Sequence, residues 1–192
     1  RYKITDYPIS LFMMLDLLWV TKFMDIQCLA IYAMARSFFS QCSEITVRFG
    51  TVFMTRTFEQ YGKGEEKEKI ASDMYRFIQI QLLITIPFTC WAIFFIAPFL
   101  IRQVTPLYAE GIYPMAILLI ASFFDMRSNN LFTIWIAEKR LIPYGKTNLI
   151  SLISMFISIT TCWFVLGYKT LNGVAVAVVI GYLINFVYIM GT

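Results

Sequence analysis

The sequence contains no histidine, and only four of its 192 residues are cysteines. The cysteines stand singly in or beside apolar runs, with no paired or CxxC spacing: Cys28, Cys42, Cys90 and Cys162. A zinc site or a histidine-based catalytic relay needs residue types that this chain does not supply. We therefore expect the cysteines to be packing residues, and we expect no enzyme activity, no cofactor and no metal site.

Charge is also scarce, because only 15% of the residues are charged whereas 59% are hydrophobic, and the mean hydropathy is +0.68. Three stretches of 22 to 25 residues carry no charged side chain: 77–101, 147–168 and 170–192. At about 1.5 Å per residue, a helix of that length crosses the hydrocarbon core of a bilayer. The sequence predicts an all-α integral membrane protein surrounded by the lipid bilayer. A soluble helical bundle is the alternative, but its helices would show a polar outer face.

Six membrane-spanning helices are predicted, forming a single lobe. Their expected bounds are about 8–21, 29–58, 77–101, 112–137, 147–166 and 172–190. We interpret the charged stretch 61–76 as a solvated connector, with a short amphipathic helix as the alternative. Pro87 and Pro98 can kink the third span. The polar patch 125–130 is expected to break the fourth span, and 138–146 is expected to be a basic loop.

The basic residues of the predicted loops indicate an orientation. With six crossings, the two chain ends and the loops 59–76 and 138–146 share one side of the membrane. That side receives ten basic residues: Arg1, Lys3, Arg56, Lys63, Lys67, Lys69, Arg76, Lys139, Arg140 and Lys146. The other side receives three: Lys22, Arg102 and Lys169. Because basic loops stay in the cytoplasm, we expect a multi-pass protein of the inner (cytoplasmic) membrane with both termini of this segment cytoplasmic.

The second predicted span carries charge in its middle. Arg36, Ser40, Glu44 and Arg48 follow one another at i, i+4 spacing, so we expect them to share one face of the helix. The opposite side is expected to carry apolar residues: Ile31, Phe38, Phe39, Ile45, Val52 and Phe53. Each charge at the centre of a membrane helix costs about 2.5–3.5 kcal/mol, and the apolar residues of this span do not return the sum. The polar face is therefore expected to border a protein interior or a water-filled cavity.

Two ion pairs are predicted at this site. Glu44 and Arg48 are four residues apart and can pair with each other, and Asp16 in the first span is a candidate partner for Arg36. Such pairs can simply hold helices together, or they can belong to a polar cavity that handles a hydrophilic or anionic cargo. We favour the cavity, because ionisable residues inside membranes commonly mark transport pathways.

The candidate residues fall into two groups. Those expected to bind the cargo are Arg36, Arg48, Ser40, Gln41 and Arg127. Those expected to couple ions or to tune the cations are Asp16, Glu44 and Asp125. Because Asp125 and Arg127 are two residues apart on a helix, at most one of them is expected to face the cavity.

Three stretches resemble a known family of membrane transporters. ISLFMMLDLLWVTKFMDIQCLAIYAMARSF (9–38), with Asp16 and Tyr32 to Ala35, is similar to the start of the second lobe in the polysaccharide (O-antigen type) flippases. These belong to the multidrug/oligosaccharidyl-lipid/polysaccharide exporter superfamily. WIAEKRLIPYGKTNLISLI (135–153) resembles the entry into their eleventh helix, and LNGVAVAVVIGYLI (171–184) resembles their twelfth. The resemblance covers nearly the whole chain as helices seven to twelve.

This resemblance implies two six-helix lobes around a central cavity, and the flipping of undecaprenyl-diphosphate-linked glycans by alternating access. Arg36 and Arg48 would then be cavity cations that accept the lipid-linked oligosaccharide, while Asp16 and Glu44 would tune them or couple transport to ions. Only one lobe is present and the chain begins with Arg1, so we expect a piece of a longer transporter whose partner is its own N-terminal lobe. No nucleic acid partner is expected.

Three alternatives stay open. An ion-coupled multidrug antiporter of the same superfamily would use Asp16 and Glu44 as coupling carboxylates. A membrane-embedded enzyme of glycolipid or acyl transfer is disfavoured by the lack of histidine and of a loop-borne carboxylate cluster. In a non-transporting membrane scaffold, the charges of the second span would serve folding alone.

Overall fold

The computed structural model describes residues 2–96, 106–138 and 141–191, and within these ranges every regular element is a helix. The α-helices are α1 (Tyr2–Phe23), α2 (Ile26–Gly62), α3 (Lys67–Trp91), α5 (Ile112–Ala137), α6 (Leu141–Thr160) and α7 (Leu171–Met190). Two π-helical turns, η1 (Ala92–Ile96) and η3 (Thr161–Val165), extend α3 and α6, and the 3-10 turn η2 (Pro106–Gly111) leads into α5. The all-α prediction is confirmed.

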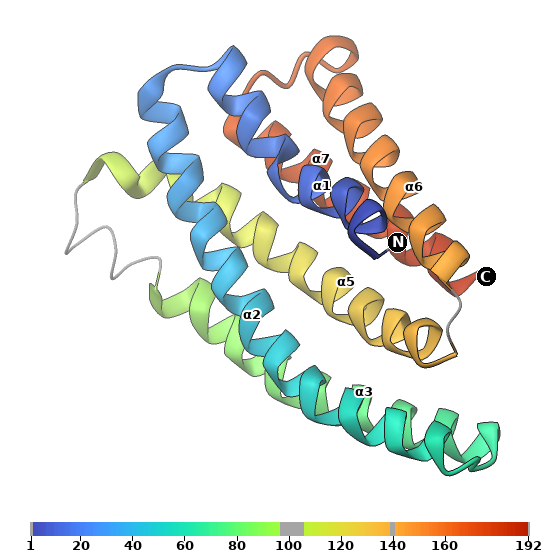
Figure 1. The fold of residues 1–192 in the computed structure, drawn as a ribbon. Helices are drawn as coiled ribbons and strands as arrows, with labels where there is room; N and C mark the ends of the chain where they lie inside the picture. Colours follow the sequence, from blue (N-terminus) through green and yellow to red (C-terminus); the bar gives the residue numbers. More distant parts are fainter. Residues whose placement is uncertain (1, 97–105, 139–140, 192) are drawn as a thin grey trace.

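Successive long helices run back and forth along the bundle (Figure 1). The central helix α5 packs against α2 on one side and α7 on the other, α6 packs against α7, and α1 packs against α6. The edge helix α3 lies along α2. The α2–α3 turn, the start of α6 and both chain ends lie toward the right of Figure 1, whereas the α1–α2 turn and the start of α7 lie at the opposite end.

In the part of the chain that the structure describes, four helical stretches are long and apolar enough to cross a membrane: Lys67–Phe95, Tyr108–Met126, Gly145–Val165 and Leu171–Met190. They belong to α3, α5, α6 and α7 with their flanking turns, and they give the chain the helices of a multi-pass membrane protein. Within the described residues, α1 and α2 contribute no such stretch, so six crossings stay a prediction.

The apolar core lies between α1, α2, α5, α6 and α7. Its large fully buried side chains include Tyr32, Leu118, Met155 and Tyr182. The helices α6 and α7 approach closely at Gly181, where an added Cβ would lie 3.2 Å from the Cα of Met155. Close packing at small residues is typical of helices in membranes, where apolar side chains gain little by leaving lipid.

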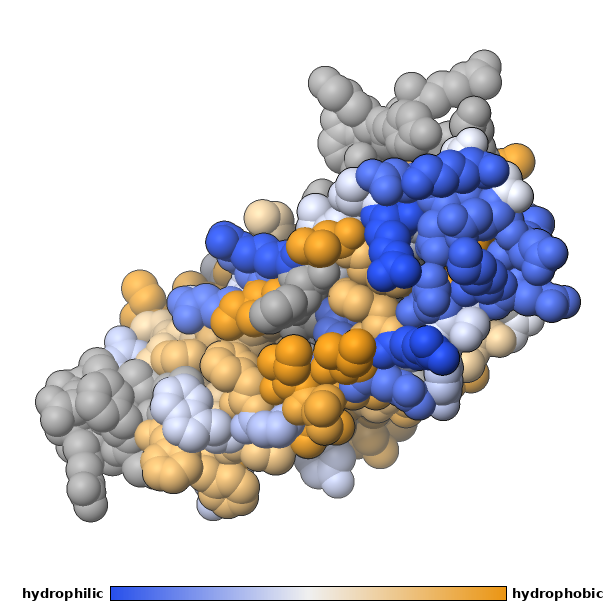
Figure 2. Space-filling view, turned by 90° about the horizontal axis from the view of Figure 1, so that it is seen from below, coloured by the Kyte–Doolittle hydropathy of each residue, from blue (hydrophilic) through white to orange (hydrophobic). Residues whose placement is uncertain are grey.

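The edge helix α3 is much less covered than the core helices. Its apolar side chains are largely exposed, with Leu83 at 75% and Phe94, in the following π-helical turn, at 73%. Figure 2 shows apolar residues over most of this side of the molecule, whereas hydrophilic residues gather at the end where the α2–α3 turn lies. This separation is expected of a bundle whose body lies in lipid and whose end reaches water.

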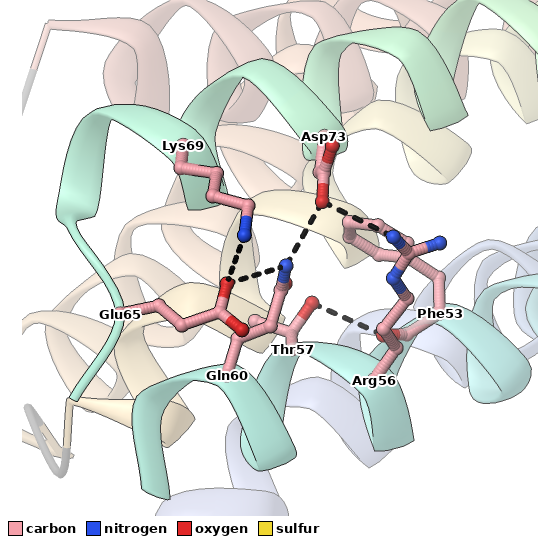
Figure 3. Close-up of polar contacts among 7 residues, drawn as sticks. All are labelled: Phe53, Arg56, Thr57, Gln60, Glu65, Lys69 and Asp73. Atoms are coloured by element: carbon pink, nitrogen blue, oxygen red, sulfur yellow. Dashed lines mark hydrogen bonds and ion pairs between the residues drawn. The ribbon is translucent and has the colours of Figure 1, made fainter. Parts of the chain in front are cut away.

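Polar contacts hold α2 and α3 together at their joined ends (Figure 3). Asp73 accepts a hydrogen bond from Gln60 at 2.9 Å and pairs with Arg56 at 3.3 Å between Nη2 and Oδ2. Glu65 pairs with Lys69 at 3.2 Å and accepts a further hydrogen bond from Gln60 at 3.3 Å. The charges of this turn thus form a connected set that ties the first turns of α3 to the end of α2.

A second contact ties the α2–α3 turn to the end of α5. The Lys67 ammonium lies 3.3 Å from Oε1 of Glu138, and the Tyr61 hydroxyl donates to the same oxygen at 3.4 Å. Burial, followed by the negative charge of Glu138, raises the pKa of Tyr61 above its usual value.

The interpretation of 61–76 as a solvated connector is wrong for most of its length. Only residues 63–66 separate α2 from α3, and residues 67–76 already form the first turns of α3. The opposite charges of this stretch lie at helical spacing, as the Glu65–Lys69 pair shows, and Asp73 docks against α2. The dense charges therefore belong to the first turns of a helix rather than to a loop.

Two further breaks were also predicted wrongly. The polar patch 125–130 does not interrupt α5, because side chains such as Ser128 bond to the helix's own backbone, here to the Phe124 carbonyl at 2.9 Å. The predicted basic loop 138–146 is already helical from Leu141, and Pro143 fits in the first turn of α6, where its missing N–H is not needed. Residues 139–140 and Pro98 lie outside the described residues, and α3 continues through Pro87.

Candidate functional site

Asp16 and Arg36 form a buried ion pair between α1 and α2. Nε of Arg36 lies 3.1 Å from Oδ2 of Asp16, and the exposed fractions of the two side chains are 13% and 0%. The Tyr32 hydroxyl, one turn before Arg36, donates to the same Oδ2 at 2.9 Å. The Arg36 guanidinium also lies 4.5 Å from the ring centroid of Phe39, a favourable cation–π arrangement. The predicted pairing of these two charges is confirmed.

Tyr182 on α7 belongs to the side chains around this pair. Its ring packs edge-to-face on Phe12 with centroids 4.8 Å apart. Its hydroxyl is in electrostatic reach of Asp16, Arg36 and Asp125, although it completes no hydrogen bond of good geometry among the described residues. The cluster thus joins α1, α2 and α7, and Asp125 of α5 is 8% exposed beside it. Charges held this tightly and away from solvent fix helices relative to one another.

The other predicted residues of α2 lie on its uncovered side. Ser40, Gln41, Glu44 and Arg48 are all exposed. Nη2 of Arg48 lies 3.8 Å from Oε2 of Glu44, and these side chains are 82% and 65% exposed. The predicted pairing is confirmed, but it is loose and open. We use the name exposed polar face for this surface, which comprises Ser37, Ser40, Gln41, Glu44, Arg48, Thr51 and Thr55.

The prediction that Arg36 shares this face is wrong. Each step of four residues turns about 40° beyond a full helical turn, so the three steps from Arg36 to Arg48 add up to about 120°. Arg36 therefore points into the bundle while Arg48 points out of it. The same drift places Val52, which was expected on the opposite side, beside the exposed polar face, where it is 76% exposed. Ile45, also expected on the opposite side, is 41% exposed.

The exposed polar face lies at the middle of a long helix. Glu44 is 18 residues from Ile26 and 18 from Gly62, the two ends of α2. Because Gly111 lies against Ile31 and Tyr61 bonds to Glu138, α2 and α5 run parallel, and the middle of α2 lies beside the last turns of Tyr108–Met126, a stretch apolar enough to cross a membrane. Charges at such a depth are costly in contact with lipid, at about 2.5–3.5 kcal/mol each on insertion scales. The exposed polar face therefore requires water or a polar partner beside it.

Arg127 belongs to α5, but its side chain lies outside the described residues. Its role as a substrate-binding residue stays a prediction. The sequence interpretation did not single out Tyr32 and Tyr182 as partners of the buried pair. The sequence could have predicted that Tyr32 lies beside Arg36, because the two residues are four apart, the spacing at which side chains on a helix meet.

One cavity lies beside the middle of α2 and another lies at one end of the bundle, and neither is lined by a predicted site residue. One, of about 240 Å³, is a groove between α2 and α3 whose walls include Cys42, Ile45 and Ile84. The other, of about 560 Å³, lies at the end of the bundle opposite the α2–α3 turn, between Cys28, Glu110 and Lys169. The four cysteines are free thiols, and Cys90 is exposed rather than packed in the core.

Comparison of the chain with protein-family models, with curated proteins and with solved structures finds no match in any of the three.

Proposed function

We propose that this chain is one six-helix lobe of a transporter that moves a lipid-linked oligosaccharide across the cytoplasmic membrane by alternating access. The main support is the exposed polar face at the middle of α2, in a bundle whose helices α3, α5, α6 and α7 each contain a stretch apolar enough to cross a membrane. A polar surface at that depth, left open by its own lobe, is what one wall of a transport cavity requires. The second lobe, by the resemblance drawn from the sequence, would supply the facing wall.

The geometry supports different roles for Arg36 and Arg48. Arg48 is exposed and only loosely held by Glu44, so its guanidinium is free to turn toward a diphosphate, which suits its planar set of donors. Ser40 and Gln41 on the same face offer hydrogen-bonding groups for sugar hydroxyls. Arg36 is already bound to Asp16 in the interior, so we assign it to holding α1 against α2 rather than to contact with the cargo.

The test is the substitution Arg48→Gln in the full-length protein that contains this chain. We expect flipping of a diphosphate-linked oligosaccharide in proteoliposomes to fall by on the order of tenfold or more, because the cationic contact with the diphosphate is lost. Thermal stability in detergent should change little, since exposed ion pairs contribute about 0–1 kcal/mol.

Arg76→Gln is the matched control, because Arg76 is an exposed arginine near the α2–α3 turn and away from the exposed polar face. Wild-type flipping by the Arg48→Gln protein would remove Arg48 from the transport pathway. If Glu44→Gln were silent as well, the non-transporting scaffold would become the better account of this chain.

A second candidate is an ion-coupled multidrug antiporter of the same superfamily. The observation that favours it is the burial of two carboxylates, Asp16 and Asp125, around one tyrosine. Intramembrane carboxylates in such surroundings are suited to taking up and releasing a proton or a sodium ion. Drug efflux driven by an ion gradient, abolished by Asp125→Asn and unaffected by Arg48→Gln, would favour the antiporter.

A further inference from the structure

The groove between α2 and α3 is apolar along the depth of the membrane. It is lined by Cys42, Ile45, Phe77, Ile80, Gln81, Ile84, Thr85 and Phe88, and its volume is about 240 Å³. The two polar members are largely buried, and the Thr85 hydroxyl is directed to the Met126 sulfur of α5 at 3.7 Å. The surface offered to an occupant is therefore made of aliphatic and aromatic carbon.

The groove exists because α2 and α3 are held together at one end only. Near the turn they are joined by the Asp73 contacts and by the parallel stacking of Phe53 on Phe77, with ring centroids 4.4 Å apart. Away from the turn the two helices diverge, as Figure 1 shows. An apolar wedge thus opens beyond Phe77 and continues toward Phe88.

The apolar groove and the exposed polar face meet at one residue of α2. Ile45 lines the groove, and it lies four residues after Gln41 and three before Arg48, so its side chain is a neighbour of both. A molecule with an anionic head and an apolar tail can therefore place its head against Arg48 while its tail enters the groove. A lipid-linked oligosaccharide has this construction.

We propose that the α2–α3 groove holds the polyisoprenoid tail of the lipid-linked substrate while Arg48 engages its diphosphate. This proposal rests on the proposed function. The volume is smaller than the roughly 300–1,000 Å³ of sites that enclose a whole ligand, so the groove takes a segment of the tail and the remainder stays in the bilayer. The groove thereby orients the tail during transport and selects substrates by tail length.

The experiment fills the groove with a larger side chain and compares substrates that differ only in their tails. Ile84→Trp places an indole in the groove, whereas Leu83→Trp, at a neighbouring residue that is 75% exposed and does not line the groove, is the matched control. Binding to the full-length protein is measured with one oligosaccharide diphosphate on a long polyisoprenoid tail and on a short isoprenoid tail. We expect Ile84→Trp to weaken binding of the long-tailed compound by on the order of tenfold, and to leave the short-tailed compound unchanged. Leu83→Trp should affect neither.

Equal effects of the two tryptophan variants, or equal loss of the long-tailed and short-tailed compounds, would overturn the groove proposal. Ile80→Trp, also in the groove, repeats the test if Ile84→Trp fails to fold. A photoreactive polyisoprenoid phosphate should label α3 between Phe77 and Phe88, and competition by an excess of ordinary phospholipid would show a site for bulk lipid instead.

If wild-type protein binds both compounds equally well, the groove proposal fails and the proposed function survives. If it binds neither, the proposed function fails.

Discussion

The two ion pairs of α2 have the same chemistry and opposite surroundings. Arg36 meets Asp16 at 3.1 Å with almost no exposure, whereas Arg48 meets Glu44 at 3.8 Å with most of both side chains exposed. The first pair joins two helices and has a tyrosine, a phenylalanine ring and α7 around it. The second pair stays within one helix, and the described residues leave most of both side chains uncovered.

This difference shows that the role of an arginine in such a bundle has to be inferred from its surroundings. A buried pair costs a large desolvation energy, and its loss leaves a charge without compensation. An open pair contributes little to folding, and its groups stay available to a ligand. One helix thus carries a structural cation in its first half and a candidate binding cation near its middle.

The largest contrast in stability is expected between Asp16→Asn and Glu44→Gln. Asp16→Asn leaves the Arg36 charge without its carboxylate in the interior, which should lower the free energy of unfolding by about 3–5 kcal/mol. Glu44→Gln breaks an exposed pair, which should change it by about 0–1 kcal/mol. Thermal unfolding of the full-length protein in detergent measures both. Equal effects would mean that burial does not separate the two pairs.

A smaller effect is expected for Tyr32→Phe, which keeps the Asp16–Arg36 pair and removes one hydrogen bond to it. Hydrogen bonds to charged groups contribute about 1.5–3 kcal/mol, so this variant should lie between the two carboxylate variants in the same unfolding measurement. Tyr182→Phe is the comparison on the α7 side of the cluster, because the Tyr182 hydroxyl is in electrostatic reach of both Asp16 and Arg36. A larger loss for Tyr182→Phe would show that α7 anchors the pair more strongly than Tyr32 does.

The smallest effect concerns pH at the α2–α3 turn, outside the bundle's apolar body. Because the pKa of Tyr61 is raised in the folded protein, its contribution to stability is complete below the ordinary pKa of about 10. That contribution is lost as the pH rises through the raised value, when the hydroxyl loses its proton beside Glu138. Tyr61→Phe should flatten this alkaline part of a stability–pH curve, and Glu138→Gln should reduce it. An unchanged curve would show that the pKa of Tyr61 does not differ between the folded and the unfolded protein.

The sequence was sufficient for the helical class and for the pairing of Asp16 with Arg36, because long charge-free runs and isolated opposite charges have few solutions in a membrane bundle. It was not sufficient to predict on which side of α2 each charged side chain lies. A row of residues at i, i+4 looks like one face over two steps, but over three steps the drift placed Arg36 and Arg48 on different sides of α2.

The predicted interruptions of helices were wrong for a related reason. The polar residues predict a connector at 61–76 and a break at 125–130, yet a helix accepts such residues when hydrogen-bonding partners are within reach. Asp73 finds Gln60 and Arg56, and Ser128 finds a carbonyl of its own helix. These partners come from the packing of α2 on α3 and from backbone geometry, and neither is visible in the order of residues alone.

The length of α2 has a mechanical consequence. Its 37 residues span about 55 Å, more than the roughly 40–45 Å of a whole bilayer with its headgroups. One part of α2 is held by Asp16 inside the bundle, and the far end is held by the contacts of Tyr61 and Lys67 with Glu138 at the end of α5. A tilt of about 5° about Arg36 would move the end of α2, about 40 Å away, by about 3 Å, and it would have to break the contacts of Tyr61 and Lys67 with Glu138. A label on the exposed Lys63 side chain would report such a tilt more sensitively than one near Arg36.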